Sequence, residues 1–189
     1  NLVGQGALQG RIPVRIGNRY EAVYPYDTFR AAGHDNYVVI AAGNDKLFHI
    51  LTQAMEKPEL ADDPRFVTNI LRVENHEQLK PIVEEWTSKL DIDEIVDKLL
   101  ALGCPAAPIN TIDRVVSDPH IAVARQMFVD CDHPVGKLKL TGNQVKLTNH
   151  PITEFRPAPL LGQDCEKVLG EKLGMSAEEV EQLRQEGVI

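Results

Sequence analysis

The sequence predicts an α/β (α+β) fold assembled from short elements. A β-hairpin pattern occupies residues 26–41, apolar residues recur at helical spacing in three stretches between 45 and 102, and strand-like runs follow residue 128. The chain has 189 residues, of which 43% are hydrophobic and 25% charged, as in ordinary globular proteins. This length allows one sizeable domain, or a small domain with an appendage.

The N-terminal elements come first in the chain. Residues 1–24 contain glycines but no sustained periodicity, which predicts a connecting segment. Residues 26–30 and 37–41 flank a Gly-His-Asp-Asn turn at 33–36, and the second run is rich in β-branched side chains. We therefore expect a hairpin after an extended linker.

Three helices are expected next. The first follows the capping residues at 43–45, with apolar residues from Leu47 to Met55, and ends at Pro58. The second buries a stripe between residues 79 and 90, where Pro81 marks either a helix start or a kink. The third begins with Asp91 and Glu94, a capping-box pair, and stops at Gly103.

The remaining elements are shorter. We expect a strand at 106–109, a helix from 110 or 111 that is interrupted at residues 118–119, and strands at 128–132, 137–140 and 144–147. A proline-rich stretch at 151–159 leads to two helices at 165–173 and 176–186, the second with a capping box. These two helices cannot build a core between themselves, so they need another surface to dock on.

Charge and hydropathy exclude several classes of protein. The net charge of −8 argues against nucleic acid as a partner, although residues 1–30 carry +2 and the remainder −10. An anionic ligand is therefore expected near the N-terminal end, unless these arginines are only solvated loop residues. No apolar run is long enough to cross a membrane and no signal peptide is evident, so we expect a cytoplasmic protein without a membrane partner. The chain starts without methionine, which suggests a piece of a longer protein.

Motifs that would mark a self-contained active site are missing from the sequence. There is no G-x-S-x-G, H-E-x-x-H, phosphate-binding loop or dinucleotide fingerprint. The six histidines are scattered, and adjacent carboxylates such as Asp62 and Asp63 are typical of a solvated face. Cys104, Cys131 and Cys165 lie far apart, without metal-ligand or disulfide spacing. We therefore predict no catalytic and no metal-binding residue in this chain.

A set of segments in fixed order is more specific. They are Arg15-Ile16-Gly17-Asn18-Arg19, Tyr24-Pro25-Tyr26-Asp27-Thr28-Phe29, residues 39–48, residues 58–66, Thr68-Asn69, Arg72-Val73, residues 105–110, Asp118-Pro119, His133-Pro134 and residues 156–162. The series resembles the C-terminal half of the class III CoA-transferases, the family that includes formyl-CoA and carnitine CoA-transferases. The resemblance covers nearly the whole chain.

The resemblance implies an architecture and a reaction. Residues 1–24 would be the linker from a Rossmann-like large domain that is missing here, 25–125 the small α/β domain, and 126–189 a tail returning to the large domain. Two such subunits would interlock as a homodimer. The family moves CoA from an acyl-CoA to a small carboxylic acid through an aspartate in the N-terminal half, and no residue here matches that aspartate. CoA thioester is thus a substrate, no covalently bound cofactor is expected, and this chain alone should be inactive.

The resemblance also implies a substrate-binding segment, Gly17-Asn18-Arg19-Tyr20. It occupies the place of the glycine loop that covers the active-site aspartate in formyl-CoA transferase, although only one glycine is present here. Glycine permits positive φ, and free N–H groups there would stabilise an oxyanion or anhydride. A plain turn entering the hairpin is the alternative for this segment. For the whole protein the alternatives are an acyl-CoA racemase of the same fold and a non-catalytic binding or assembly module.

Overall fold

The computed structural model describes residues 10, 12, 14–152 and 154–189. The chain divides between Asn110 and Thr111 into two compact units, and each is described by itself. This boundary lies inside the range predicted for the small domain. The division into 1–24, 25–125 and 126–189 stays a prediction about the complete protein.

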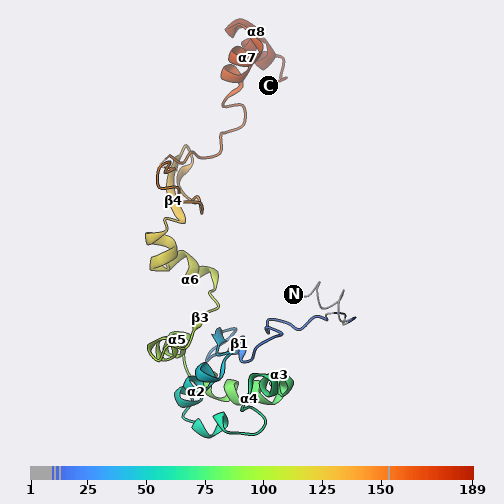
Figure 1. Ribbon diagram of the computed structural model, residues 1–189. Helices are drawn as coiled ribbons and strands as arrows, with labels where there is room; N and C mark the ends of the chain where they lie inside the picture. The colour runs from blue at the N-terminus through green and yellow to red at the C-terminus, as the bar shows by residue number, and fades with distance from the viewer. Residues whose placement is uncertain (1–9, 11, 13, 153) are drawn as a thin grey trace. The chain divides into compact units, whose positions relative to one another are not determined.

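The first unit is organised around a three-stranded antiparallel sheet of order β1-β2-β3 (Figure 1). Strands β1 (Tyr26–Arg30) and β2 (Tyr37–Ala41) form the predicted hairpin, with Phe29 opposite Val38. Strand β3 (Ala106–Pro108) pairs with the other edge of β2. Phe29, Val38 and Ile40 are fully buried, so one face of the hairpin forms the floor of the core.

The described residues of this unit also form five helical segments. They are α2 (Asp45–Ala54), the short 3₁₀ helix η1 (Pro58–Ala61), α3 (Asn69–Glu74), α4 (His76–Thr87) and α5 (Ile92–Ala101). Asn44 caps α2 by accepting a hydrogen bond from the Leu47 N–H at 2.8 Å. The apolar faces of α2, α4 and α5 supply Leu51, Val83, Leu99 and their neighbours to the core.

Two of these segments were not expected from the sequence. The first helix was expected to end at Pro58, with a turn at residues 62–64 before the next helical stretch, but η1 lies before this turn and α3 forms a separate short helix after it. Both are too short to show helical periodicity, and α3 depends on its cap, where the Thr68 hydroxyl accepts from the Leu71 N–H at 3.4 Å. Pro81 lies inside α4, which resolves the choice between a helix start and an interior position.

The second unit contains α6 (Ile112–Ser117), the π-helical turn η2 (Pro119–Ala124), β4 (Phe128–His133), β5 (Gly136–Thr141), α7 (Cys165–Leu173) and α8 (Ala177–Gln185). Strands β4 and β5 form an isolated antiparallel pair. The strand predicted at 144–147 is wrong. The Gln144 carbonyl instead accepts from Arg125 at 3.2 Å, and Lys146 donates to the Gln126 carbonyl at 3.4 Å, so this stretch is held by side chains rather than by a strand ladder.

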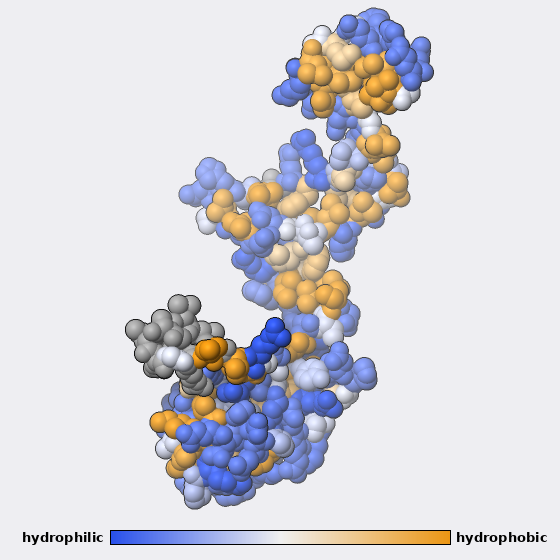
Figure 2. All heavy atoms as spheres, turned by 90° about the vertical axis from the view of Figure 1, so that its right-hand side faces the viewer, coloured by the Kyte–Doolittle hydropathy of each residue, from blue (hydrophilic) through white to orange (hydrophobic). Residues whose placement is uncertain are grey.

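The last two helices leave apolar side chains uncovered. Both halves of the predicted capping box at Ser176 and Glu179 are present at the start of α8. Val180 is buried, whereas Leu173 is 69% exposed, and apolar side chains gather on a face of the α7–α8 pair (Figure 2). Docking of these helices on another surface remains a prediction. Among the described residues, none of the helices combines the length and apolar character needed to span a membrane.

Candidate functional site

Residues 16–25, here called the entry segment, lead into β1 and contain the four predicted substrate-binding residues. Gly17 and Asn18 form a turn in which Gly17 has φ +70°, a conformation that favours glycine. The Asn18 amide donates to the Thr28 hydroxyl at 3.3 Å, and the Tyr20 N–H donates to the Tyr26 carbonyl at 2.9 Å. The turn is therefore tied to β1, and the Tyr20 and Tyr26 rings pack with their centroids 5.5 Å apart.

Gly17 faces open space. A β-carbon at this position would have no atom within 4 Å apart from its chain neighbours, and the residue is exposed. Its glycine is therefore required by the backbone angle and not by a crowded neighbour. An open turn with positive φ is the geometry expected of a loop that approaches a ligand or another surface.

Two hollows meet at Arg19. The first, of about 480 Å³, is lined by Arg19, Glu21, Ala22, Asn69, Ile70, Val73, Glu74 and His76. The second, of about 390 Å³, is lined by Ile16, Arg19, Asp27, His76, Glu77, Lys80, Pro81 and Glu84. Arg19 and His76 line both. Of the four predicted residues, the structure thus brings Arg19 to the concave surface, while Gly17, Asn18 and Tyr20 lie beside it on the same segment.

The charges in these hollows are mixed. Carboxylates outnumber arginine and lysine in both linings, so neither is a positive patch. In the second hollow, the nearly buried Asp27 is neutralised by Lys80, whose ammonium lies 2.7 Å from the carboxylate and 3.0 Å from the Thr28 carbonyl. The charges of the residues that line these hollows therefore do not support an anionic ligand near the N-terminal end, and that expectation stays a prediction.

Tyr24 lies at the base of the entry segment. Its side chain is fully buried against the rings of Phe29 and His76, at centroid distances of 6.5 and 5.9 Å. Burial raises the pKa of the Tyr24 phenol above its ordinary value of 10, and the negative charges of Asp27 and Glu84 raise it further. The hydroxyl has no hydrogen-bond partner among the described residues, so it is a polar group buried at a cost.

Helix α3 fastens the entry segment, and sequence reasoning missed this role. The Asn69 amide donates to the Ala22 carbonyl at 2.9 Å and its oxygen accepts from the Tyr24 N–H at 3.0 Å. The fully buried Arg72 donates to the Tyr24 carbonyl at 2.8 Å and to the Phe66 carbonyl at 2.9 Å. Its guanidinium also pairs with Asp45 at 2.7 Å and lies 4.6 Å from the centre of the Phe48 ring.

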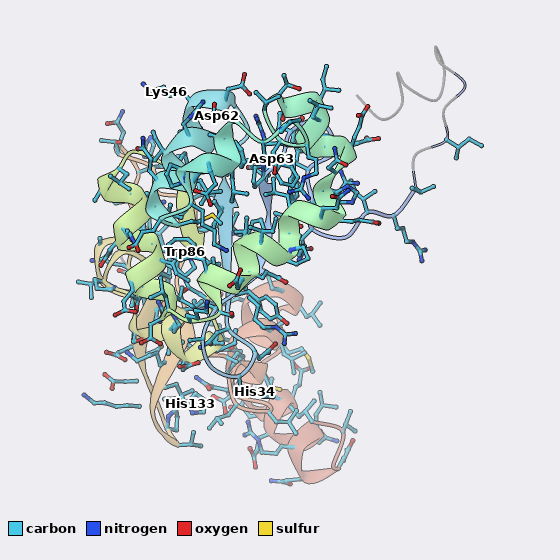
Figure 3. The ribbon with its side chains drawn as sticks, turned by 90° about the horizontal axis from the view of Figure 1, so that it is seen from below. His34, Lys46, Asp62, Asp63, Trp86 and His133 are labelled. Carbon is cyan, nitrogen blue, oxygen red and sulfur yellow. The ribbon has the colours of Figure 1, made fainter. Side chains whose placement is uncertain are left out.

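Among the described residues of the first unit, the structure does not bring together into one site the side chains that the sequence analysis considered for chemistry. His34 in the hairpin turn and Asp62 and Asp63 near η1 lie at opposite ends of the first unit (Figure 3). The Asp63 carboxylate forms an ion pair with the Arg65 guanidinium, at 2.6 Å. Burial raises the pKa of the Cys104 thiol to about 11, which suppresses its thiolate. Within the described ranges, no group of three or more histidine, cysteine or acidic side chains is placed to hold a metal ion.

The comparisons with known proteins identify the family. The model of CoA-transferase family III matches residues 1–165. This chain belongs to CoA-transferase family III. The resemblance found in the sequence is thereby confirmed, and the elements described above confirm the mixed α/β fold.

Two curated CoA-transferases are about one third identical to this chain over the part that aligns. Human succinyl-CoA:glutarate CoA-transferase is 32% identical over 193 residues, which cover 100% of this chain and 41% of that protein. Succinyl-CoA:mesaconate CoA-transferase of Haloarcula hispanica is 36% identical over 171 residues, covering 89% and 42%. The chain thus spans about two fifths of the length of these relatives.

A solved structure supports the same assignment. The crystal structure of a CAIB/BAIF family protein from Brucella suis superposes with a TM-score of 0.78 at 31% identity, over 90% of this chain and 43% of that one. The family assignment leaves the substrate-binding role of Gly17, Asn18, Arg19 and Tyr20 as a prediction.

Proposed function

We propose that this chain is the C-terminal part of a CoA-transferase that moves CoA from an acyl-CoA thioester to a free carboxylic acid. The observation that carries this proposal is the match to CoA-transferase family III over residues 1–165. The two relatives described above are named for transfer between succinyl-CoA and glutarate or mesaconate, which are dicarboxylic acids. A short dicarboxylic acid is therefore the acceptor that we propose.

The covalent chemistry is proposed to take place outside this chain. An aspartate of the N-terminal part would attack the acyl-CoA to form a mixed anhydride and release CoA as a thiolate. The thiolate would then attack the aspartyl carbonyl, which forms an enzyme-bound CoA thioester and releases the donor acid. The acceptor carboxylate would attack this thioester, and the released thiolate would take the acceptor's acyl group from the resulting anhydride, which gives the new acyl-CoA and frees the aspartate.

The family resemblance supports this division, because no residue of this chain matches the family's aspartate. CoA thioester is then a substrate, with no covalently bound cofactor, and we propose that two copies of the full-length protein form the enzyme.

The entry segment is proposed to close over the reacting carboxylate. Its open turn at Gly17 offers backbone N–H groups, and hydrogen bonds to an oxyanion or anhydride oxygen stabilise the charge that develops there. Arg19, at the edge of both hollows, places a cation beside this turn. Gly17, Asn18, Arg19 and Tyr20 form the substrate-binding segment of this proposal.

The experiment uses two reaction mixtures, one that follows the transfer of CoA and one that follows the exchange of the substrate α-proton. In the first mixture, full-length protein in D₂O receives succinyl-CoA and ¹³C-labelled glutarate or mesaconate. In the second, it receives a branched 2-methylacyl-CoA. The products of each are separated by chromatography and their masses are measured by mass spectrometry. We expect labelled acyl-CoA from the first mixture and no deuterium at the α-carbon in the second. Deuterium uptake without transfer would show a racemase, and no product in either mixture would favour a binding or assembly module.

A further inference from the structure

Along residues 22–24, the entry segment pairs with no β-strand of the described part of the chain, and side chains of α3 bind its backbone instead. The Ala22 carbonyl and the Tyr24 N–H are both bound by the Asn69 carboxamide, at 2.9 and 3.0 Å, and the Tyr24 carbonyl is bound by Arg72 at 2.8 Å. Asn69 and Arg72 are three positions apart, so they share one face of the helix. Three backbone polar groups that would otherwise lack a partner are thus satisfied by a single short helix.

The two side chains differ in what else they do. Arg72 also binds the Phe66 carbonyl and Asp45, so it holds several parts of the first unit together. The hydrogen bonds found for the Asn69 side chain among the described residues all go to the entry segment. A carboxamide is suited to this task because it donates and accepts at once, as the backbone of a neighbouring strand does.

The bonds to residues 22 and 24 reach the predicted site through a short span of chain. Tyr20 is closed onto β1 by its N–H bond to the Tyr26 carbonyl, so residues 20–26 form a loop whose ends are joined. The Asn69 side chain binds the backbone of residues 22 and 24, in the middle of this loop. If these bonds are lost, the loop can change its path. Because Tyr20 joins the loop to the turn at Gly17, this change would loosen the Tyr20–Tyr26 and Asn18–Thr28 bonds that tie the turn to β1, and the turn could then move.

We propose that Asn69 is a positioning residue that sets the path of the entry segment, and thereby the place of the turn at Gly17, in the transferase. The proposal rests on the proposed function for its catalytic consequence, because positioning matters to turnover only if this segment closes the site. Its conformational part does not depend on that function. A misplaced donor near a reacting centre lowers turnover even when substrate still binds.

The test compares Asn69→Ala with Asn75→Ala in the full-length protein. Asn75 is a matched control because its carboxamide also donates and accepts: it donates to the carbonyls of Arg65 and Leu71 at 3.2 and 3.0 Å and accepts from the Gln78 side chain at 3.1 Å, and none of these bonds goes to the entry segment. Should Asn69→Ala fail to fold, Asn69→Asp replaces it at nearly equal volume: the carboxylate keeps the acceptor for Tyr24 and loses the donor for Ala22.

Two readouts are taken on each variant. Trypsin cleavage after Arg19 under native conditions reports local opening of the segment, and we expect it to be about tenfold faster for Asn69→Ala and within about twofold of wild type for Asn75→Ala. In the transferase assay, kcat should fall about tenfold for Asn69→Ala with KM nearly unchanged, while Asn75→Ala keeps the wild-type kcat.

The outcomes separate the two ideas. If wild-type protein transfers no CoA, the proposed function fails, and the trypsin result alone decides whether Asn69 holds the segment. If wild type transfers CoA but both variants are cleaved and turn over alike, the positioning role is overturned and the function stands. A rise in KM with unchanged kcat and unchanged cleavage would also overturn it, since Asn69 would then act as a contact within the first hollow.

Discussion

Replacing Gly17 by valine separates a site residue from a plain turn. Gly17 has φ +70°, and a β-carbon there would meet no atom within 4 Å, so the cost to folding comes from the backbone angle alone. A residue with a β-carbon in this region costs about 1–2 kcal/mol. The melting temperature falls by about 2–4 °C per kcal/mol for a protein of 150–250 residues, and by less for a longer one. In the full-length protein it should therefore fall by only a few degrees.

The effect on catalysis should be much larger. If N–H groups of this turn stabilise the developing charge, losing one such donor costs about 2.7–4 kcal/mol, or about a hundredfold or more in kcat. Both quantities are measured on the purified full-length Gly17→Val protein, by calorimetry and by the rate of CoA transfer.

Gly103→Val is the matched control. Gly103 lies in the same unit, has φ +80°, and also has no atom within 4 Å of an added β-carbon, but it follows α5 far along the chain from the entry segment. Its substitution should lower the melting temperature by a similar amount and leave kcat unchanged. Equal losses of stability in the two variants with normal kcat in both would refute the site role of Gly17.

Three further predictions concern buried groups. Arg72→Met should lower the free energy of unfolding by about 3–5 kcal/mol in chemical denaturation, because the carbonyls of Tyr24 and Phe66 lose their donor. Asp45→Asn should cost under about 1 kcal/mol, since the Asp45 side chain is 64% exposed. Equal losses of stability in the two variants would contradict this. Tyr24→Phe should leave stability unchanged or raise it at pH 8. Above pH 10, the raised pKa keeps Tyr24 protonated in the folded state while it ionises in the unfolded state, so the stability of the wild-type protein falls as the pH rises. The Tyr24→Phe variant should lack this contribution to the fall, which melting curves at several pH values would show. At pH 7, Cys104 should be alkylated about a hundredfold more slowly in native than in unfolded protein from its raised pKa alone, and similar rates in mass spectrometry would contradict its burial.

Local sequence signals were sufficient where a contact spans three or four residues. The cap at Asn44, the capping boxes at Asp91 and Ser176, and the hairpin turn were all predictable, because donor and acceptor lie within one turn of the chain. The strand predicted at 144–147 failed for the opposite reason. Its alternating pattern is real, but a strand exists only with a partner, and that stretch is held by Arg125 and by the Lys146 side chain instead.

The supports of the candidate site could not be predicted in the same way. Asn69 reaches Ala22 across 47 positions, and Arg72 reaches Tyr24 across 48. Both residues stood in segments that resemble the family, but a resemblance assigns no partner to a side chain. The turn at Gly17 was found because the Gly17-Asn18 pair is a local turn signal and stands in the place of the family's glycine loop, whereas the hollows at Arg19 depend on the packing of α3 and α4.

The most direct measurement is the rate at which CoA passes from succinyl-CoA to a labelled dicarboxylic acid. The full-length protein, this chain alone and a buffer control are assayed side by side by mass spectrometry. We expect new labelled thioester with the full-length protein, and none above buffer with this chain, because the proposed reactive aspartate belongs to the N-terminal part. Turnover by the isolated chain that survives further purification, or none by the full-length protein with any acid tested, would contradict the account.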